Sequence, residues 1–294
     1  MFDVVVLTLD EGCGTRVPVL ALRDALVAAG ARVEAVDVGS DAEIDEVLAR
    51  FDGPARPDGL PWPADDGKTR LVVAASADGQ VRAVLRRLVR RYAPPPRSRP
   101  ADLPADRTVP DLPPVAILPM APGGLAARLD LPTDPAGVAA ALLGGRVRRL
   151  DLLRTDSGSV TLDGALLGST DENGRAVRWR GRVEVDDTVL TDGDDPLLAC
   201  AVANATTYTS LDGLPLLSTA DPADGTIDVA VAVPVVRRTL VRRRIEVEVR
   251  RARGRAVAVT PRGDVGLLDD GVAGSLTRKR SWWVERSAWS VYCT

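Results

Sequence analysis

The residues best suited to chemistry lie in a short turn, Ser76 to Gly79, that follows a run of apolar residues. Leu71 to Ala75 is β-branched or small throughout, as in a strand buried on both faces of a parallel sheet. After the turn, apolar residues recur at the spacing of an amphipathic helix: Val81, Val84, Leu85, Leu88 and Tyr92. Together, strand, turn and helix start present backbone N–H groups and a positive dipole end, which suits a phosphate. Turn chemistry alone also accounts for an Asp-Gly at such a junction.

Composition narrows the chemistry that this turn could support. The chain has 294 residues and no histidine, which excludes Ser-His-Asp and Cys-His catalysis as well as histidine metal sites. The 41 acidic and 38 basic side chains nearly cancel, so no global positive field argues for nucleic acid. Three widely separated cysteines without metal-ligand spacing indicate reduced thiols in a cytoplasmic protein. No signal pattern or bilayer-length apolar run occurs, so any membrane contact is expected to be peripheral.

The elements around the turn predict an α/β domain with a parallel sheet flanked by helices. Asp3 to Leu9 and Arg32 to Val38 have the pattern of strands, joined by an apolar-periodic helix from Val17 to Ala29. Their connecting turn lacks the glycine spacing of a Rossmann fingerprint or a P-loop. A later strand, Val115 to Leu118, runs into a second glycine turn, Pro119 to Gly124, and then into a helix.

Two proline-rich stretches, residues 53–69 and 93–114, interrupt this pattern. The second is expected to be a mobile loop or a polyproline segment. A loop in this position between two strands is either a lid or a surface insertion.

From about Asp151 onward the sequence pattern is typical of an antiparallel sandwich. Short strand patterns alternate with turns such as Asp163-Gly164 and Asn173-Gly174. We therefore predict two domains, an α/β domain over residues 1–151 and an all-β sandwich over 152–294. The alternation from Trp282 to Tyr292 favours a half-buried terminal strand over a base-stacking surface.

Five stretches occur in the order of a known motif set. They are a strand and turn at 73–80, a strand and turn at 118–130, a junction at 145–151, the sequence ADPADGTIDV at 220–229, and LDDGV at 268–272. They resemble the GGDGT, PxGTGNDFARxLG, GxxRxxDL, AxPxDGxLDV and DGE motifs of the diacylglycerol kinase-like lipid kinases. That superfamily includes bacterial diacylglycerol kinases, sphingosine kinases and, more distantly, NAD kinases.

The resemblance implies an ATP-dependent kinase that phosphorylates a lipid hydroxyl with the help of Mg²⁺. In it, Asp78 would be the catalytic base, and Asp224 would bind a structural Mg²⁺ with the carbonyls of Asp221 and Thr226. It also implies that residues from about 282 to 294 return to the first domain. The ATP phosphates would be held by the two glycine turns, at Ser76, Ala77, Asp78, Gly79, Gln80, Gly123 and Gly124.

The expected partners are a lipid substrate or ligand and the surface of a membrane, with a homodimer left open and no nucleic acid. Two arginine clusters, at residues 82–91 and 237–244, would attract anionic headgroups or nucleotide phosphates. Alternatively, these clusters are solvated faces paired with the many acids of the chain.

The sequence departs from the family where the chemistry is done. Ala77 and Gln80 replace a glycine and the threonine of the first motif, and Pro122 and Leu125 replace a threonine and an aspartate of the second. Val272 stands in place of the DGE glutamate, the expected general base of the bacterial enzymes. Two interpretations follow: a weak lipid kinase that uses Asp78 as its base, or a catalytically inactive member that binds lipid or nucleotide.

Overall fold

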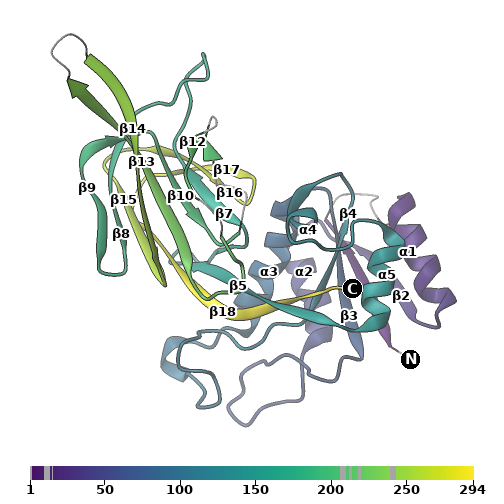
Figure 1. The fold of residues 1–294 in the computed structure, drawn as a ribbon. Coiled ribbons are helices and arrows are strands. Elements are labelled where there is room, and N and C mark those ends of the chain that lie inside the picture. Colours follow the sequence, from purple (N-terminus) through teal and green to yellow (C-terminus); the bar gives the residue numbers. More distant parts are fainter. Residues whose placement is uncertain are drawn as a thin grey trace. The chain divides into compact units, whose positions relative to one another are not determined.

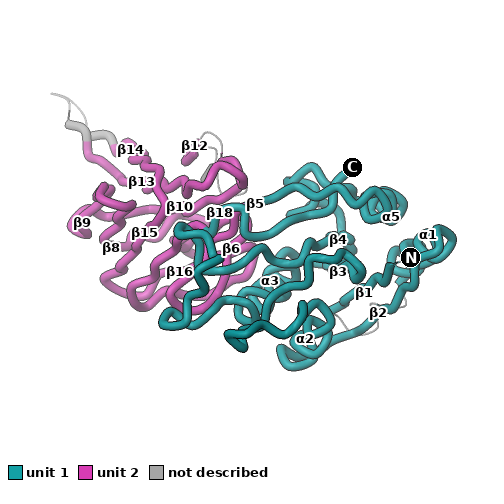
Figure 2. The backbone as a smooth tube through the Cα atoms, turned by 90° about the horizontal axis from the view of Figure 1, so that it is seen from below, with its two compact units in different colours: residues 1–150, 285–294 teal, residues 151–284 magenta. Residues whose placement is uncertain are grey.

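The chain folds into two compact units. The computed structural model describes residues 2–9, 14, 16–205, 210–211, 214–217, 220–238 and 243–294. Unit 1 comprises residues 1–150 and 285–294, and unit 2 comprises residues 151–284 (Figure 2). Strands β5 (Val147–Thr155) and β18 (Arg280–Tyr292) each run from one unit into the other.

Unit 1 is built on a parallel sheet in the order β2-β1-β3-β4. The last part of β18 continues it, because Val291 pairs in parallel with Val115. The predicted strands form. β1 (Asp3–Thr8), β3 (Thr69–Ala75) and β4 (Val115–Pro119) are mostly buried, whereas β2 (Arg32–Asp37) lies at the edge of the sheet and none of its residues is buried.

Helices cover both faces of this sheet (Figure 1). Helices α1 (Val17–Ala28) and α5 (Pro135–Gly144) pack with the inward side chains of β1, β3 and β4 into one apolar cluster. Helices α2 (Asp41–Leu48) and α3 (Asp78–Tyr92) lie together on the other face. The short helix α4 (Gly124–Arg128) follows β4.

Local signals set the helix ends. Ser40 accepts the Glu43 N–H at 3.3 Å, and Asp134 accepts the Ala136 and Gly137 N–H groups at 3.1 and 2.9 Å. Gly145 ends α5 in the left-handed conformation, φ +68°, that a side chain would disfavour.

The arginines of α3 are largely paired rather than displayed. Arg86 contacts Asp41 at 2.8 Å, and the Arg87 side chain, only 9% exposed, contacts both Asp41 and Asp45. Arg91 pairs with Asp52. These contacts favour the interpretation of this cluster as a face paired with acids, and Arg87 is buried rather than exposed.

The proline-rich segment 93–114 is packed, which corrects the expectation of a mobile loop. Leu103, Val109 and Leu112 are buried, and the segment includes a 3-10 turn at Pro96–Ser98. The Thr108 N–H donates to the buried carboxylate of Glu285 at 2.7 Å, and its hydroxyl donates to the same group. The apolar residues between the prolines hold the loop against unit 1, so proline content alone was misleading.

Unit 2 is an antiparallel sandwich, as predicted. One sheet has the order β14-β13-β10-β7-β16-β17, and β8 pairs with both β9 and β15 in the other. Side chains of both sheets, including Leu167, Val183, Val229 and Trp282, share one buried core. The strands are β6 (Val160–Thr161), β7 (Gly164–Leu167), β8 (Trp179–Val185), β9 (Thr188–Leu197), β10 (Ala199–Ala203), β11 (Ser210–Leu211), β12 (Leu214–Pro215), β13 (Ile227–Arg238), β14 (Arg243–Gly254), β15 (Ala256–Pro261), β16 (Val265–Asp269) and β17 (Val272–Leu276).

Strand β18 forms at the predicted place but is more buried than its alternation suggested. Trp282 and Trp289 are 0% and 1% exposed, so neither can stack on a base. Among the described helices, none combines the length and apolar character needed to cross a membrane.

Candidate functional site

The two glycine turns named by the sequence lie side by side in unit 1. Strands β3 and β4 pair in parallel with Ala75 opposite Pro119, so both turns leave the same carboxyl edge of the sheet. The Met120 N–H donates to the Ala75 carbonyl at 2.8 Å and joins the turns directly. In open α/β sheets ligands bind outside this edge.

Asp78 links the two turns through its carboxylate. It is the first residue of α3, and its Oδ1 accepts the N–H of Leu125, in the first turn of α4, at 2.7 Å. Its Oδ2 accepts a hydrogen bond from Arg128 at 2.5 Å. The close approach explains the glycine at position 124, because a Cβ there would lie 2.9 Å from Asp78 Oδ1 and φ is +77°.

Gln80, in the first turn of α3, accepts backbone N–H groups at the start of that helix. Its Oε1 accepts the Ser76 N–H at 2.7 Å and the Ala77 N–H at 3.4 Å. This is half of a capping box, because Ala77 has no side-chain oxygen with which to return the interaction. The amide oxygen therefore sits where a bound anion would meet these two donors.

The arrangement thus brings the two predicted turns together and gives three backbone donors beside them acceptors within the protein. Gln80 accepts the N–H groups of Ser76 and Ala77, and the Asp78 carboxylate accepts that of Leu125 and also pairs with the Arg128 guanidinium. Sequence reasoning placed Arg128 inside the second motif without a role. The signal that was available was the replacement of threonine by glutamine at position 80, a residue long enough to fold back over its own helix start.

In unit 2 the turn at residues 268–272, which resembles the DGE motif, binds backbone groups of a neighbouring segment. The Asp270 carboxylate accepts the N–H groups of Leu162, Asp163 and Gly164 at 2.8, 2.9 and 3.2 Å. The neighbouring Asp269 accepts the Thr161 hydroxyl at 2.8 Å. Val272, in the place of the family's glutamate, is 47% exposed and apolar, so it supplies no base.

The residues expected to bind Mg²⁺ do not fit a cation. Asp224 Oδ1 accepts the Thr226 N–H and hydroxyl at 2.9 and 2.6 Å, and its Oδ2 accepts a hydrogen bond from Arg253. Both oxygens of the one expected carboxylate ligand therefore face donors. Nor do the described residues contain a group of three or more acidic or thiol side chains arranged for a metal.

Arg253 bridges Asp224 and Asp228, and sequence reasoning missed it. Its Nε lies 3.0 Å from Asp228 Oδ1. Burial raises the pKa of Asp228, whereas the nearby guanidinium lowers it. The sequence alone did not specify the register of this hairpin, which places Asp228 directly opposite Arg253. A guanidinium therefore lies against the carboxylate to which the family resemblance assigned a metal.

A buried amide joins neighbouring segments of unit 2. Asn204 Nδ2 donates to the carbonyls of Asp151 and Leu162 at 3.0 and 2.8 Å. Asp151 in turn accepts the Gly225 N–H at 2.6 Å. These bonds hold the segment that carries Asp221 and Asp224 next to the start of the sandwich.

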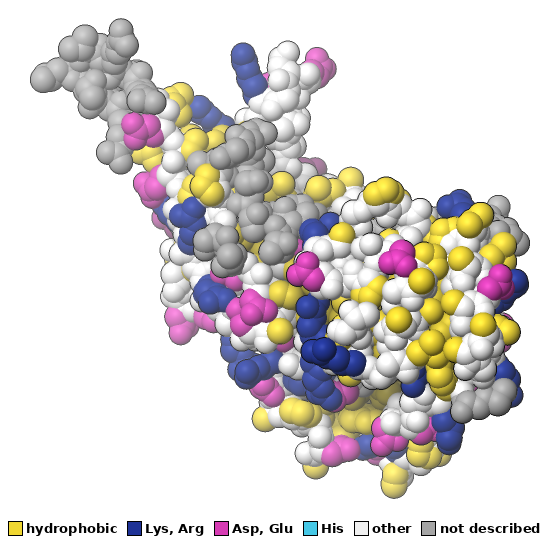
Figure 3. Space-filling model, turned by 45° about the vertical axis from the view of Figure 1, so that its right-hand side comes forward, with side chains coloured by type: hydrophobic (Ala, Val, Ile, Leu, Met, Phe, Trp, Pro, Cys, Tyr) yellow, Lys and Arg dark blue, Asp and Glu magenta, His cyan; other side chains and the backbone are white. Residues whose placement is uncertain are grey.

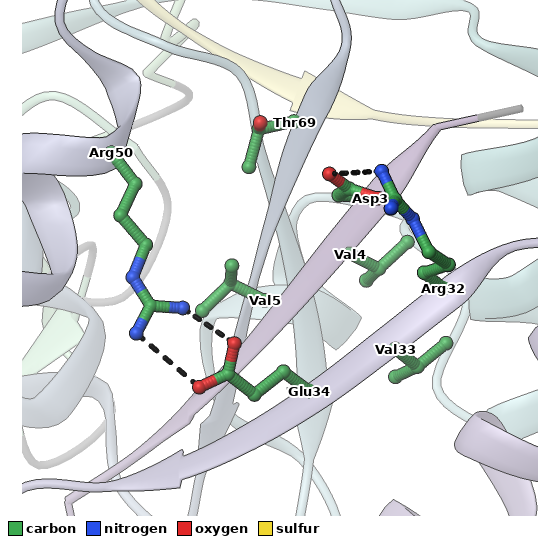
Figure 4. A pocket seen from close by; sticks show the side chains of 8 residues that line it. All are labelled: Asp3, Val4, Val5, Arg32, Val33, Glu34, Arg50 and Thr69. Atoms are coloured by element: carbon green, nitrogen blue, oxygen red, sulfur yellow. Dashed lines mark hydrogen bonds and ion pairs between the residues drawn. The ribbon is translucent and has the colours of Figure 1, made fainter.

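Two cavities in the part of the chain that the structure describes lie away from the two turns. One of about 380 Å³ opens at the amino ends of β1, β2 and β3, on the edge opposite to the turns (Figure 4). Its charged side chains pair with one another, Arg32 with Asp3 and Arg50 with Glu34, each at 2.6 Å. A second cavity, of about 490 Å³, lies in unit 2 beside Trp179. Basic and acidic side chains both occur across the face in Figure 3, in keeping with the small net charge.

Comparison with known proteins identifies the fold. A diacylglycerol kinase from Bacillus anthracis str. Sterne has a crystal structure similar to this chain, with a TM-score of 0.62 and 15% identity, over 100% of this chain and 97% of that one. Another structure from the same organism, assigned as a diacylglycerol kinase, gives a TM-score of 0.64 at the same identity and coverage. No protein-family model matches the sequence, and no curated protein matches it. The predicted fold, an α/β domain with a parallel sheet followed by an all-β sandwich, is that of diacylglycerol kinase-like structures.

Proposed function

We propose that this chain is a diacylglycerol kinase-like protein that binds lipid at a membrane surface and does not transfer a phosphoryl group at a rate comparable to a working kinase. The observation that supports the proposal is that protein side chains accept backbone donors at both turns. Gln80 accepts two N–H groups of the first turn, and Asp78 accepts the Leu125 N–H just after the second turn.

Phosphate binding at these turns would have to displace protein groups. A phosphate needs free N–H donors and a favourable potential. The carboxylate of Asp78 opposes an incoming phosphate, since two unit charges 4 Å apart interact by about 4 kcal/mol at an effective dielectric of 20. Arg128, which would favour the phosphate, already pairs with that carboxylate.

The absence of a general base at position 272 also argues against efficient phosphoryl transfer. Val272 cannot accept a proton, and loss of a general base costs about 10²- to 10⁴-fold in rate. A second candidate, a weak lipid kinase, is favoured by the position of Asp78 at the junction of both turns. In that case Asp78 would have to leave Leu125 and Arg128 to accept the proton of the lipid hydroxyl.

Nucleotide binding separates the two candidates. We expect no saturable thermal shift and no calorimetric binding when ATP with Mg²⁺ is added to the full chain, and no phosphorylated product from diacylglycerol micelles. Diacylglycerol or phosphatidic acid in mixed micelles should bind equally with and without ATP and Mg²⁺. Turnover that disappears in Asp78→Asn would establish the kinase instead.

A gain-of-function variant sharpens this test. Gln80→Thr removes the oxygen that reaches Ser76 and Ala77 and restores the family's residue. We expect Gln80→Thr to bind ATP measurably more tightly than the wild type, whereas the control Arg90→Gln, on the same helix beyond the turn, should not. Equal nucleotide affinity of wild type and Gln80→Thr would show that the glutamine does not block the turn.

A further inference from the structure

We infer that the outer half of the β13–β14 hairpin attaches this protein to the surface of an anionic lipid bilayer. The inference deepens the proposed function, because it names the element and the lipid charge through which a membrane is engaged. It makes no use of the glycine turns, so it can be tested whether or not the chain proves to be a kinase.

The outer half of this hairpin is a two-stranded ribbon. Strand β10 pairs with β13 only from Asp228 to Ala232, whereas β13 and β14 remain paired out to Arg238 and Arg243. The ribbon projects beyond the rest of unit 2 (Figure 1). A two-stranded ribbon is at best marginally stable in water by itself, so an exposed apolar face on it calls for a partner.

One face of the ribbon is apolar. Residues directly opposite each other share a face, and here Val236 lies opposite Ile245 and Pro234 opposite Val247. Val236, Ile245 and Val247 are 55%, 59% and 39% exposed. On the same face one step inward, Ala232 and Val249 belong to the packed cluster of unit 2, so the stripe runs outward from the core.

The opposite face differs between the two strands. On β14 it carries Glu246 and Glu248, and Glu248 contacts Arg250 at 2.8 Å. On β13 it carries Val233, which is buried, and Val235, which packs against the core of unit 2. The exposed apolar side chains of the first face can therefore enter the headgroup layer while the glutamates remain in water.

The positive charge of residues 237–244 favours an anionic lipid surface as the partner. Residues 237–244 contain five arginines and no acid, together with Leu240 and Val241. Each basic residue near an anionic lipid surface strengthens binding by about fivefold at moderate salt. A second copy of the chain is disfavoured as the partner, because a symmetric contact through this patch would bring two arginine clusters together.

Vesicle flotation of the full chain tests the inference. We expect the wild type to float with vesicles of equimolar phosphatidylcholine and phosphatidylserine and to stay behind with phosphatidylcholine alone. The double variant Val236→Ser/Ile245→Ser should bind the mixed vesicles about tenfold or more weakly, since two β-branched side chains no longer leave water. Arg237→Glu/Arg238→Glu should bind more weakly still.

A matched control makes the outcome interpretable. Val177→Ser/Val189→Ser alters two valines of unit 2 with similar exposure, 43% and 45%, outside the ribbon, and should float like the wild type. Equal melting temperatures of all variants show that folding is unaffected. The inference fails if the wild type ignores mixed vesicles, if it binds both vesicle types equally, or if the ribbon variant still floats. A wild-type dimer that the ribbon variant converts to a monomer, without flotation, would identify a second copy as the partner instead.

Discussion

At the scale of single residues, carboxylates of the family motifs serve structure here. Asp78 ties two turns together, Asp270 collects three backbone donors, and Asp224 is held by Thr226 and Arg253. Buried N–H groups must find acceptors, and removal of an acceptor costs more than the net gain from the bond itself. Mutation of these aspartates should therefore lower the free energy of unfolding, whatever its effect on activity.

Asp270 offers the strongest case. Asp270→Ala leaves the N–H groups of Leu162, Asp163 and Gly164 without their acceptor, and we expect it to lower the free energy of unfolding of unit 2 by about 3 kcal/mol. Asp270→Asn should cost less, because it keeps one oxygen and tolerates the φ of +47°. Urea unfolding followed by tryptophan fluorescence measures both. Asp264→Ala, at an exposed position of the same unit, should unfold like the wild type.

Arg253→Ala should make stability depend more strongly on pH. Without the guanidinium, the pKa of Asp228 rises further above its ordinary value of 3.8. An acid whose pKa is higher in the folded chain than in the unfolded chain destabilises the fold as the pH rises through that interval. We expect the free energy of unfolding of the variant to be close to that of the wild type at strongly acidic pH and about 1 kcal/mol lower at neutral pH.

Urea unfolding at several pH values from acidic to neutral tests this sign. Arg262→Ala is the matched control, because its side chain is also 54% exposed and pairs with Asp194 at the surface. If the loss of unfolding free energy in Arg253→Ala, relative to the wild type, becomes smaller as the pH rises, the proposed role of this guanidinium is contradicted.

At the scale of elements, side chains distant in sequence determine which segments are held in place. Segment 93–114 is fixed by Thr108 on Glu285 and by buried Leu103, Val109 and Leu112. The basic face of α3 is held against α2 by Arg86 and Arg87. Neither arrangement follows from proline content or from the arginine count.

Glu285→Ala should loosen segment 93–114. It removes the acceptor of the Thr108 N–H and hydroxyl, and a loss of about 1–3 kcal/mol would raise local opening by about 5- to 150-fold. Limited trypsin digestion should therefore cut after Arg97 faster in the variant. Glu172→Ala, in an exposed turn, should be cut at the wild-type rate. Unchanged cleavage would show that the apolar residues alone hold the segment.

At the scale of the whole molecule, the chain crosses between its units through β5 and β18, so unit 1 is completed by residues from both ends of the sequence. Ala288, Trp289 and Val291 are buried in it at 0%, 1% and 0% exposure. Ala288 also accepts the Leu112 N–H at 2.9 Å. The core of unit 2, in contrast, ends with Val284.

Deletion of residues 285–294 should therefore damage the units unequally. Loss of one large buried aromatic costs about 3–5 kcal/mol, and here Trp289 is lost together with a paired strand. We expect the cooperative melting of unit 1 to disappear in calorimetry, whereas unit 2 keeps a transition. Deletion of Thr294 alone should leave both transitions in place. Simultaneous loss of both transitions in the longer deletion would mean that unit 2 depends on unit 1 for folding.

The sequence by itself determined the kinds of elements and the turns between them. Apolar runs at Leu71–Ala75 and Val115–Leu118 predicted buried strands, and alternation beyond Asp151 predicted the sandwich, because hydrophobic periodicity is a local property of the chain. Only the tertiary structure decided how the candidate site is satisfied. Asp78 meets Arg128 fifty positions away, and Arg253 meets Asp224 across a hairpin. Such pairings depend on distances between side chains that folding brings together, and those distances decide whether a motif residue faces a ligand or its own protein.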